Sequence, residues 1–492
     1  MVSYLLAIDQ GTSSSRAIVF DEFGDIKFIS QQPVDLIYPH DGWVEQDPNV
    51  LLNSTFSVVK NVLSEDRDVS LSISGVGITN QRETTIVWDR KTGEPVYNAI
   101  VWQDRRTANY CTTLKGEGIE EVVREKTGLL LDPYFSATKL RWILENVEGA
   151  RSRAENGDLL FGTVDCYLLW HLTGGRVHAT DVTNASRTML YNIIGQNWDD
   201  YLLDLFDIPS NLMPKVFGNI SDFGQIDSGL FGFDNVIRGM AGDQQSALIG
   251  QGCVQKGMVK STYGTGCFSL MNIGGDAVLS DNKLLTTIGY RVDGKVSYAL
   301  EGSIFNSGTA IQFLRDNLGL IKDAKDSEEA ALSVSDNGGV FFVPAFTGLG
   351  APYWNPAACG VICGLSRDTK GEHIVRAALE AQAYQTRDLI DVMSKDGSCD
   401  IGVMRADGGL VANGFMCQFL SDMLGVAVEI PKVAECTAWG VACLAGVQSG
   451  VFSSIDEVSS RWVSDRVYKP SQEYDKMDEL YGEWKRAVEK SY

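Results

Sequence analysis

The chain has 492 residues, more than one hydrophobic core usually supports, so two domains are expected. Apolar residues make up 44% of the sequence, and 64 acidic residues against 42 basic ones give a formal net charge of −22. An acidic excess of this size opposes non-specific binding to nucleic acid or to anionic membranes, so it favours a small-molecule ligand.

Cysteine usage and the first residues indicate the cellular compartment. The ten cysteines are scattered without a C-x-x-C pair, which favours reduced thiols over the alternative, a disulfide network. Asp9 interrupts the first apolar run, so this run predicts a strand rather than a signal peptide, and no stretch is long enough to span a bilayer. We therefore expect a cytoplasmic protein without integral membrane association. The four histidines do not cluster, so a zinc site is not expected.

The first half of the chain begins with strands and continues with helices. Residues 4–9, 16–21 and 26–30 are short runs of strand-forming residues separated by turns, which predicts a three-strand meander. Residues 71–96 add a strand, a polar loop and a second strand. Residues 105–210 are mainly helical in pattern, because apolar residues recur three and four positions apart, as in ATKLRWILENV.

The second half repeats the pattern with which the chain begins. Residues 257–275 read GMVKSTYGTGCFSLMNIGG, an apolar strand, a glycine turn and another apolar strand. Residues 403–424 place a strand before paired glycines and an amphipathic helix. Two similar modules half a chain apart predict a duplicated architecture, with domains at residues 1–249 and 250–492.

Two glycine turns have the features of phosphate-binding loops. The segments DQGTSSSR (residues 9–16) and TYGTG (262–266) combine hydroxyl side chains with glycines that let the backbone approach an anion closely. Asp407-Gly408-Gly409 precedes a predicted helix, whose positive end can face phosphate. Either Gly-Thr turn alone is also compatible with an ordinary hairpin, but the three segments together favour a phosphate site. Neither G-x-x-x-x-G-K-[ST] nor a G-x-G-x-x-G after a strand occurs.

Asp9 stands where the first strand delivers its last side chain into the loop. A carboxylate there suits Mg²⁺, directly or through water, because this cation prefers carboxylates, waters and phosphate oxygens. The alternative is an aspartate that only initiates the turn.

Seven segments together resemble the FGGY carbohydrate kinase family, which belongs to the actin, hexokinase and heat-shock ATPase superfold. The resemblance runs from about residue 4 to about residue 450 and is strongest to the members that phosphorylate glycerol. It implies an α/β fold of two ribonuclease-H-like domains, with mixed sheets flanked by helices and ATP with Mg²⁺ in an interdomain cleft. It also implies phosphoryl transfer to glycerol, giving sn-glycerol 3-phosphate and ADP, in a homodimer or homotetramer. The segments are DQGTSSSR, GITNQRETTIVWDR, VWQDRR, AGDQQSALIGQ, TYGTGCF, PAFTGLGAPYW and DGG-VAN.

A polyol site needs hydrogen-bonding groups for the hydroxyls and aromatic walls for the CH faces. The resemblance implies that Asp243 is the base that takes the hydroxyl proton. Taken singly, Asp243 is also compatible with a helix cap, and Trp102 with a core residue. Arg82 and Glu83 are compatible with a solvated turn pair, and Tyr134 with a packed loop residue. The implied acceptor-binding residues are Arg82, Glu83, Trp102, Tyr134, Asp243, Gln244 and Phe268.

The resemblance also assigns the nucleotide side of the site. Asp9 is the implied Mg²⁺ ligand, through water. The implied nucleotide-binding residues are Thr12, Ser13, Ser14, Arg16, Thr265, Gly308, Gln312, Gly409 and Asn413.

The sequence departs from the family at two regulatory positions. Some bacterial members bind fructose 1,6-bisphosphate at a glycine-rich loop, but here the segment QIDSGLFGFDNVIRG lacks the glycine cluster. No histidine lies between His178 and His373, which argues against activation by histidine phosphorylation. Two alternative functions remain. One is a kinase for another polyol or a ketose, and the other is an actin-like ATPase without an acceptor site.

Overall fold

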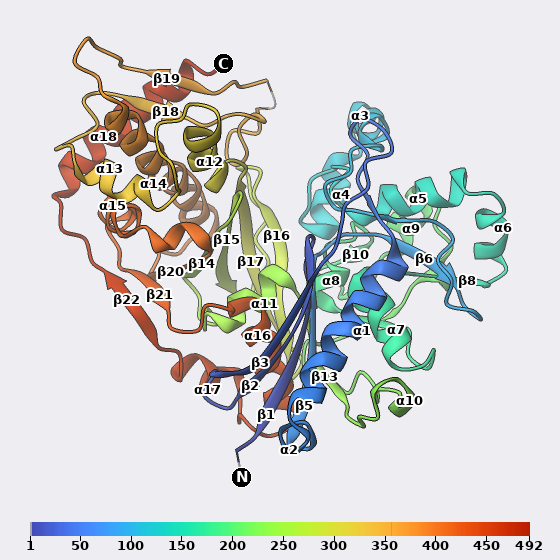
Figure 1. Cartoon of the computed structure of the whole chain (residues 1–492). Coiled ribbons are helices and arrows are strands. Elements are labelled where there is room, and N and C mark those ends of the chain that lie inside the picture. The colour runs from blue at the N-terminus through green and yellow to red at the C-terminus, as the bar shows by residue number, and fades with distance from the viewer. Residues whose placement is uncertain (1, 356) are drawn as a thin grey trace.

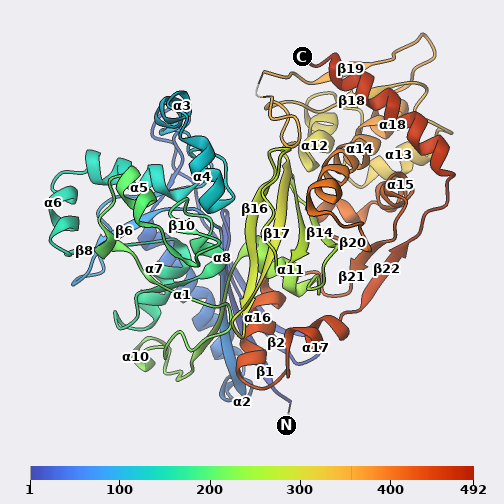
Figure 2. The same ribbon diagram turned by 180° about the vertical axis from the view of Figure 1, so that it is seen from behind.

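The computed structural model describes residues 2–355 and 357–492, which form two mixed β-sheets with helices packed around them (Figure 1). The N-terminus and C-terminus lie at opposite ends of the molecule, as the reverse view also shows (Figure 2). This arrangement confirms the predicted α/β class with mixed sheets flanked by helices.

The first sheet has the strand order β13-β5-β1-β2-β3. β1 pairs antiparallel with β2 and parallel with β5, and β13 pairs parallel with β5. The predicted meander and the predicted strand within residues 71–80 are therefore confirmed. The strands are β1 (Tyr4–Gln10), β2 (Ser14–Asp21), β3 (Ile26–Pro33), β5 (Ile73–Asn80) and β13 (Ile237–Gly242).

The second sheet repeats this arrangement in the order β16-β17-β15-β14-β20-β21-β22. β14 pairs antiparallel with β15 and parallel with β20, as β1 does with β2 and β5. The predicted duplication is therefore confirmed, and the two glycine turns occupy corresponding positions. The strands are β14 (Met258–Tyr263), β15 (Cys267–Gly274), β16 (Leu285–Val292), β17 (Lys295–Ile304), β20 (Val403–Asp407), β21 (Val428–Pro431) and β22 (Ser464–Tyr468).

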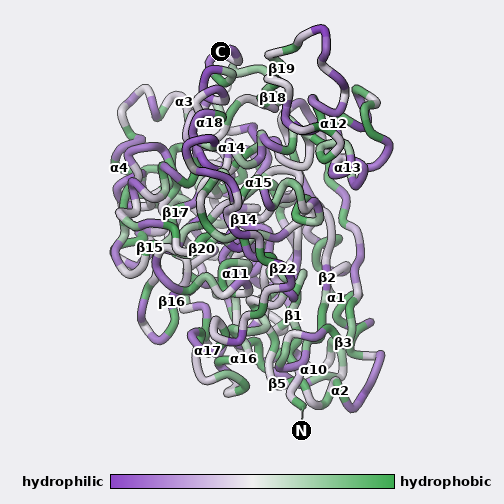
Figure 3. Tube along the Cα trace, turned by 90° about the vertical axis from the view of Figure 1, so that its left-hand side faces the viewer, coloured by the Kyte–Doolittle hydropathy of each residue, from purple (hydrophilic) through white to green (hydrophobic). Residues whose placement is uncertain are grey.

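The buried strand β1 is apolar on both faces because a helix covers each of them. Leu6 and Ile8 belong to the core cluster that includes α1 (Pro48–Glu65). Leu5 and Ala7 point the other way, into a cluster with residues of α16 (Cys436–Gln448). The alternation follows from the two-residue period of a strand, so β1 holds its last side chains in fixed directions. Figure 3 shows hydrophobic segments around β1, β5 and α16, whereas α18 (Tyr474–Glu489) is largely hydrophilic.

Two helices, α11 (Asp243–Gly250) and α16, form contacts between the first and second halves of the chain. α11 follows the last strand of the first sheet. α16 lies between β21 and β22 of the second sheet, yet it packs on β13, β5 and β1. The two helices also pack against each other, in the middle of Figures 1 and 2. A Cβ atom at Gly440 would collide with the carbonyl group of Ser246, so only glycine allows the backbones to come this close.

We expect Gly440→Ala to destabilise the protein by about 1–3 kcal/mol, because an added methyl group forces two packed backbones apart. Gly482→Ala is the matched control, since a methyl group added at this helical glycine would meet no other part of the protein within 4 Å. That substitution should stabilise the protein by about 0.5–1 kcal/mol. Thermal melting of both variants measures the two effects, and an unchanged melting temperature for Gly440→Ala would contradict the packing argument.

The predicted helical region within residues 105–210 contains helices that short strands interrupt. The helices there are α3 (Ala108–Gly116), α4 (Glu120–Thr127), α5 (Ser136–Asn146), α6 (Ala150–Glu155), α7 (Val164–Leu172), α8 (Val182–Ala185) and α9 (Asp200–Leu205). The short strands of the first half are β4 (Glu45–Gln46), β6 (Ile86–Asp89), β7 (Ala99–Ile100), β8 (Leu159–Gly162), β9 (Ala179–Asp181), β10 (Tyr191–Asn192), β11 (Asn197–Trp198) and β12 (Lys215–Phe217).

The remaining elements complete the two halves. In the first half they are α2 (Arg67–Leu71), the 3-10 helix η1 (Ser210–Leu212) and α10 (Ser228–Phe231). In the second half they are α12 (Gly308–Asp316), α13 (Asp326–Leu332), β18 (Phe341–Val343), β19 (Val361–Cys363), α14 (Gly371–Gly397), the 3-10 helix η2 (Gly409–Ala412), α15 (Gly414–Leu424), α17 (Ile455–Ser460) and α18 (Tyr474–Glu489).

All ten cysteines are free thiols. Among the helices of residues 2–355 and 357–492, none is long and apolar enough to cross a membrane.

Candidate active site

The first glycine turn joins β1 to β2 and is held by its own backbone. The Gly11 N–H donates to the carbonyl of Ser14 at 2.9 Å, and the carbonyl of Ser13 accepts from Val34. Asp9 is the penultimate residue of β1, with only 2% of its surface exposed. The loop is therefore a rigid turn that presents Asp9 at its base.

Arg16 lies opposite Asp9 in the β1–β2 pair and ties this loop to the other half of the chain. Its guanidinium donates to Asp9 Oδ2 at 2.5 Å and to Glu435 Oε2 at 2.5 Å, just before α16. Burial raises the pKa of Asp9, and Arg16 partly offsets this rise. The predicted metal ligand and a predicted nucleotide-binding residue are thus direct neighbours.

An aromatic wall brings together three predicted acceptor residues. The Trp102 ring lies edge-on to Tyr134 with centroids 5.6 Å apart, and to Phe268 at 6.4 Å. The Trp102 indole N–H also donates to Thr12 Oγ1 at 2.9 Å, which fixes the ring against the first glycine turn. Phe268 comes from β15 of the second sheet, so both halves of the chain build this wall.

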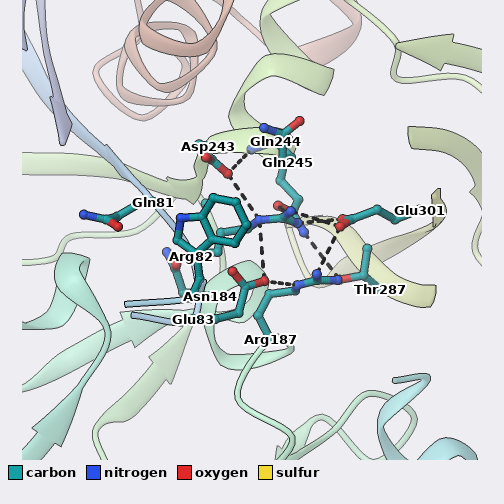
Figure 4. A network of polar contacts seen from close by, with 12 residues as sticks. Gln81, Arg82, Glu83, Asn184, Arg187, Asp243, Gln244, Gln245, Thr287 and Glu301 are labelled. Atoms are coloured by element: carbon teal, nitrogen blue, oxygen red, sulfur yellow. Dashed lines mark hydrogen bonds and ion pairs between the residues drawn. The ribbon is translucent and has the colours of Figure 1, made fainter. Parts of the chain in front are cut away.

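Arg82, in the loop after β5, is the centre of a buried charged cluster (Figure 4). Its guanidinium donates to both carboxylate oxygens of Glu301 on β17, at 2.6 and 3.0 Å. Its Nε lies 3.2 Å from Asp243 Oδ1. The bidentate pair fixes the plane of the guanidinium, so Glu301 determines which nitrogen faces Asp243.

Glu83 and Arg187 complete this cluster. Arg187 Nε donates to Glu83 Oε1 at 2.5 Å, and its Nη2 donates to Glu301 Oε1 at 3.0 Å. Glu83 has a left-handed backbone with φ of 61°, which costs about 1–3 kcal/mol for a residue with a side chain. Ser136 Oγ and Lys139 Nζ donate to its carbonyl at 2.9 and 3.3 Å and hold this conformation. Such strain persists where surrounding contacts over-determine it, as they do here.

The carboxylates of the cluster differ in proton affinity. Burial alone would raise the pKa of Glu301, but Arg187 and Arg82 lower the pKa to about 2. Burial raises the pKa of Asp243, with Arg82 partly offsetting the rise. Asp243 is also the more accessible group, because 31% of its side chain is exposed against 2% for Glu301. An accessible carboxylate with raised proton affinity is a suitable general base.

Asp243 opens α11 as its first residue, and Gly242 is the N-cap. Asp243 is therefore not the N-cap residue, but its Oδ1 still accepts from the N–H of Gln244 in the first turn at 2.7 Å. The Gln244 side chain accepts a hydrogen bond from Lys260 Nζ at 2.5 Å. The two predicted residues thus lie side by side at the start of one helix.

The second glycine turn packs against the start of α12. Gly308 N–H donates to the carbonyl of Gly264 at 2.9 Å, and Ser307 N–H donates to that of Thr265 at 3.0 Å. A Cβ at Gly308 would collide with the Gly264 carbonyl, so only glycine lets these two backbone segments come this close. Gln312 lies one turn further along α12 and is exposed.

The glycine pair after β20 leads into η2 rather than directly into the predicted helix. Gly409 begins η2, and α15 begins at Gly414. Asn413 is the N-cap of α15, where its Oδ1 accepts from Met416 N–H at 2.9 Å and its amide donates to Ser327. The Asn413 side chain therefore has a structural role in addition to any contact with a nucleotide.

Three charged residues of the site were not predicted from the sequence: Arg187, Lys260 and Glu301. Lys260 and Glu301 each stand within an apolar strand, in MVKSTY and YALEGSI, and both side chains are buried. A charge inside an apolar strand is rarely left unpaired, so this pattern was a usable signal. Arg187 follows α8 in a polar segment, where nothing in the sequence marks its burial.

Comparison with known proteins agrees with the geometry of the site. Residues 4–250 match the model of the FGGY family of carbohydrate kinases, N-terminal domain, and residues 259–449 match the C-terminal domain of the same family. A protein named glycerol kinase from Nitrosomonas eutropha is 57% identical over 485 residues, which are 99% of this chain and 97% of that protein. Glycerol kinase 2 from Thermotoga maritima is 54% identical over 490 residues, 100% of this chain and 99% of that protein.

A solved structure is also similar over the whole chain. The crystal structure of Plasmodium falciparum glycerol kinase with ADP superposes with a TM-score of 0.96 at 36% identity, covering 100% of this chain and 98% of that chain. With the two family models covering both halves, this chain belongs to the FGGY family of carbohydrate kinases.

Proposed function

We propose that this protein is a glycerol kinase, which transfers the γ-phosphoryl group of ATP to a hydroxyl of glycerol and gives sn-glycerol 3-phosphate and ADP. Full-length relatives with this name at 52–57% identity support the proposal. The observation that carries it is the accessible Asp243 carboxylate, held by Arg82 at 3.2 Å beside an aromatic wall. An ATPase that transfers phosphate only to water would need neither this oriented carboxylate nor the aromatic wall.

The acceptor site follows from what glycerol presents. Its hydroxyl groups need charged or polar partners, because a buried hydroxyl without a partner costs about 1–3 kcal/mol, and its CH groups need apolar surface. Asp243 is the proposed base. The proposed hydrogen-bonding residues are Arg82, Glu83, Tyr134, Asp243 and Gln244, and the proposed apolar wall is Trp102 and Phe268.

ATP is the proposed phosphoryl donor, with Mg²⁺ bound near Asp9. Asp9 keeps one carboxylate oxygen outside the Arg16 pair, and Asp407 Oδ1 is buried without a hydrogen-bond partner among the described residues. This donor set fits a cation held by one or two carboxylates plus waters and phosphate oxygens. Bound Mg²⁺ would neutralise phosphate charge. The proposed nucleotide-binding residues are Thr12, Ser13, Ser14, Arg16, Thr265, Gly308, Gln312, Gly409 and Asn413.

The residues of this chain would support one in-line displacement. Asp243 accepts the proton of the attacking hydroxyl, while Arg82 and Gln244 orient the acceptor. Donors around the two glycine turns hold the phosphates. We propose that residues 1–249 and 250–492 act as two domains that close over the substrates and exclude water, and that the protein forms a homodimer or homotetramer.

A coupled ADP-release assay with Mg²⁺-ATP tests the function. The panel of acceptors is glycerol, dihydroxyacetone, erythritol, xylulose, gluconate and no acceptor. We expect turnover that depends on glycerol. Higher turnover with a larger polyol or ketose would assign the other kinase function, and equal turnover without any acceptor would assign an ATPase.

A further inference from the structure

We propose that Lys260, a buried lysine on β14, is a catalytic residue that contacts the transferred phosphoryl group. The inference rests on the proposed kinase function and adds a cation to that site. The Lys260 side chain reaches the acceptor residues from the second sheet, although the sequence stretch MVKSTY reads as an ordinary apolar strand.

The ammonium group of Lys260 is held at the boundary between the two sets of site residues. It donates to Gln244 Oε1 at 2.5 Å and to the carbonyl of Phe268 at 3.5 Å. Both partners are neutral, and both belong to the proposed acceptor site. An ammonium group has three N–H donors, so one donor remains for a ligand.

The arginines of the site are engaged differently, because each already forms ion pairs with carboxylates. Among the described cations of this site, only Lys260 and Lys139 donate hydrogen bonds solely to neutral groups, and Lys139 holds the backbone carbonyls of Glu83 and Val101, whereas Lys260 lies beside Gln244 and Phe268. Phosphoryl transfer needs cationic groups on the transferred phosphate, and lysine serves as a point charge for phosphate. The engaged pairs are Arg16 with Asp9 and Glu435, Arg82 with Glu301 and Asp243, and Arg187 with Glu83 and Glu301.

The surroundings of Lys260 are buried and contain a second charged group, Asp407. Asp407 pairs in register with Thr262, two residues along β14, so Lys260 and Asp407 share one face of the sheet. Burial lowers the pKa of Lys260, while Asp407 and Asp243 oppose this effect. Asp407 Oδ1 is buried and unpartnered within the described part of the chain. Within residues 2–355 and 357–492, Lys260 thus has one N–H without a partner, and Asp407 on the same face of the sheet has one carboxylate oxygen without a partner. Buried polar groups are normally hydrogen-bonded, so these two groups indicate that a bound ligand completes the site.

The role of Lys260 in the transfer is electrostatic. The acceptor hydroxyl oxygen forms a bond to the γ-phosphorus, and the bond to the oxygen that bridges to the β-phosphorus breaks. The electron pair of the broken bond stays on ADP, and the hydroxyl proton passes to Asp243. Lys260 keeps its protons and donates one N–H to an oxygen of the moving phosphoryl group.

Lys260→Met removes the charge at similar length, and Arg405→Met is the matched control. Arg405 is the cross-strand neighbour of Lys260, but its guanidinium faces Glu429 at 3.1 Å and the Trp462 ring at 3.6 Å. Calorimetric titrations compare ADP with a non-hydrolysable ATP analogue that carries a γ-phosphate. We expect Lys260→Met to weaken the affinity for the analogue about tenfold more than the affinity for ADP. The same substitution should lower kcat by about 10²–10³-fold. Arg405→Met should leave the ratio of the two affinities unchanged.

An unchanged ratio of analogue to ADP affinity in Lys260→Met would overturn the proposal, because Lys260 would then only hold Gln244 in place. If that variant does not fold, Lys260→Gln provides the test, because it also removes the charge: an affinity for the analogue weakened severalfold more than the affinity for ADP supports the charge contact, and an unchanged ratio contradicts it. The titrations need no acceptor. They therefore remain valid even if the acceptor panel shows that the wild-type protein does not use glycerol.

Discussion

Asp243→Asn should lower kcat by about 10³-fold, because a general base contributes about 10²–10⁴-fold to such a proton transfer. The amide keeps the shape of the side chain and can still accept from the Gln244 N–H, but it cannot take the hydroxyl proton. ADP affinity should stay within twofold, since the nucleotide loops are built from other residues. Steady-state kinetics and ADP calorimetry on the same preparation measure both effects.

Asp388→Asn is the control for this variant. Asp388 lies on α14, where its buried carboxylate accepts from Tyr481 at 2.6 Å and from Trp484 at 3.0 Å. Asp388→Asn should lower the melting temperature, because it weakens these buried hydrogen bonds, but kcat should stay within a few-fold of the wild-type value. If Asp243→Asn retains kcat within tenfold of wild type, Asp243 is not the base.

The pH profile gives an independent check on Asp243. Its pKa is raised above the ordinary value of 3.8, chiefly by burial, and a base must be deprotonated to act. The acid limb of kcat/KM for the wild type should therefore fall at a pH above 3.8.

Local turn chemistry made the strands and glycine turns predictable. The β1–β2 and β14–β15 hairpins were predicted because each turn is encoded within a few residues by glycine between apolar runs. The duplicated sheet order followed from recognising the second hairpin as a repeat of the first. The predicted helix after Asp407 began five residues later than the paired glycines suggested, because Asn413 rather than a glycine caps it.

The sequence could mark Lys260 and Glu301 as buried charges, but it could not show which residues they pair with, because tertiary structure sets those pairs. Glu301 and Arg82 are 219 residues apart, and nothing local couples them. The crossing of α16 onto the first sheet has the same origin, because an apolar helix does not encode which sheet it covers. Arg82 was predicted through family resemblance, whereas the carboxylate that orients it is visible only in the folded chain.

A substitution of Glu301 should affect both the stability of the protein and the binding of glycerol. Glu301→Gln leaves two buried guanidinium groups, those of Arg82 and Arg187, without their shared carboxylate. Breaking a buried ion pair by removing one partner costs about 3–5 kcal/mol. We also expect a glycerol KM raised by tenfold or more, because Arg82 loses the bidentate contact that orients it, while ADP affinity changes little. Chemical denaturation and steady-state kinetics measure the two effects.

The pH dependence separates this ion-pair effect from a simple packing defect. The pKa of Glu301 is lowered from 4.5 to about 2, so its contribution to folding is complete above pH 4.5 and is lost as the pH falls toward 2. A shift of that size corresponds to about 3 kcal/mol. The stability difference between wild type and Glu301→Gln should therefore shrink as the pH falls from 5 to 3.

Glu380→Gln is the matched control for this dependence. Glu380 is equally buried and pairs with Arg376 at 2.8 Å, but burial raises rather than lowers its pKa. A raised pKa means that the folded state holds its proton more tightly, so the carboxyl group favours folding most at low pH and less as the pH rises. The two substitutions should thus change the pH dependence of stability in opposite senses. A Glu301→Gln deficit that stays constant between pH 5 and 3 would show that the cluster stabilises the fold by packing rather than by charge.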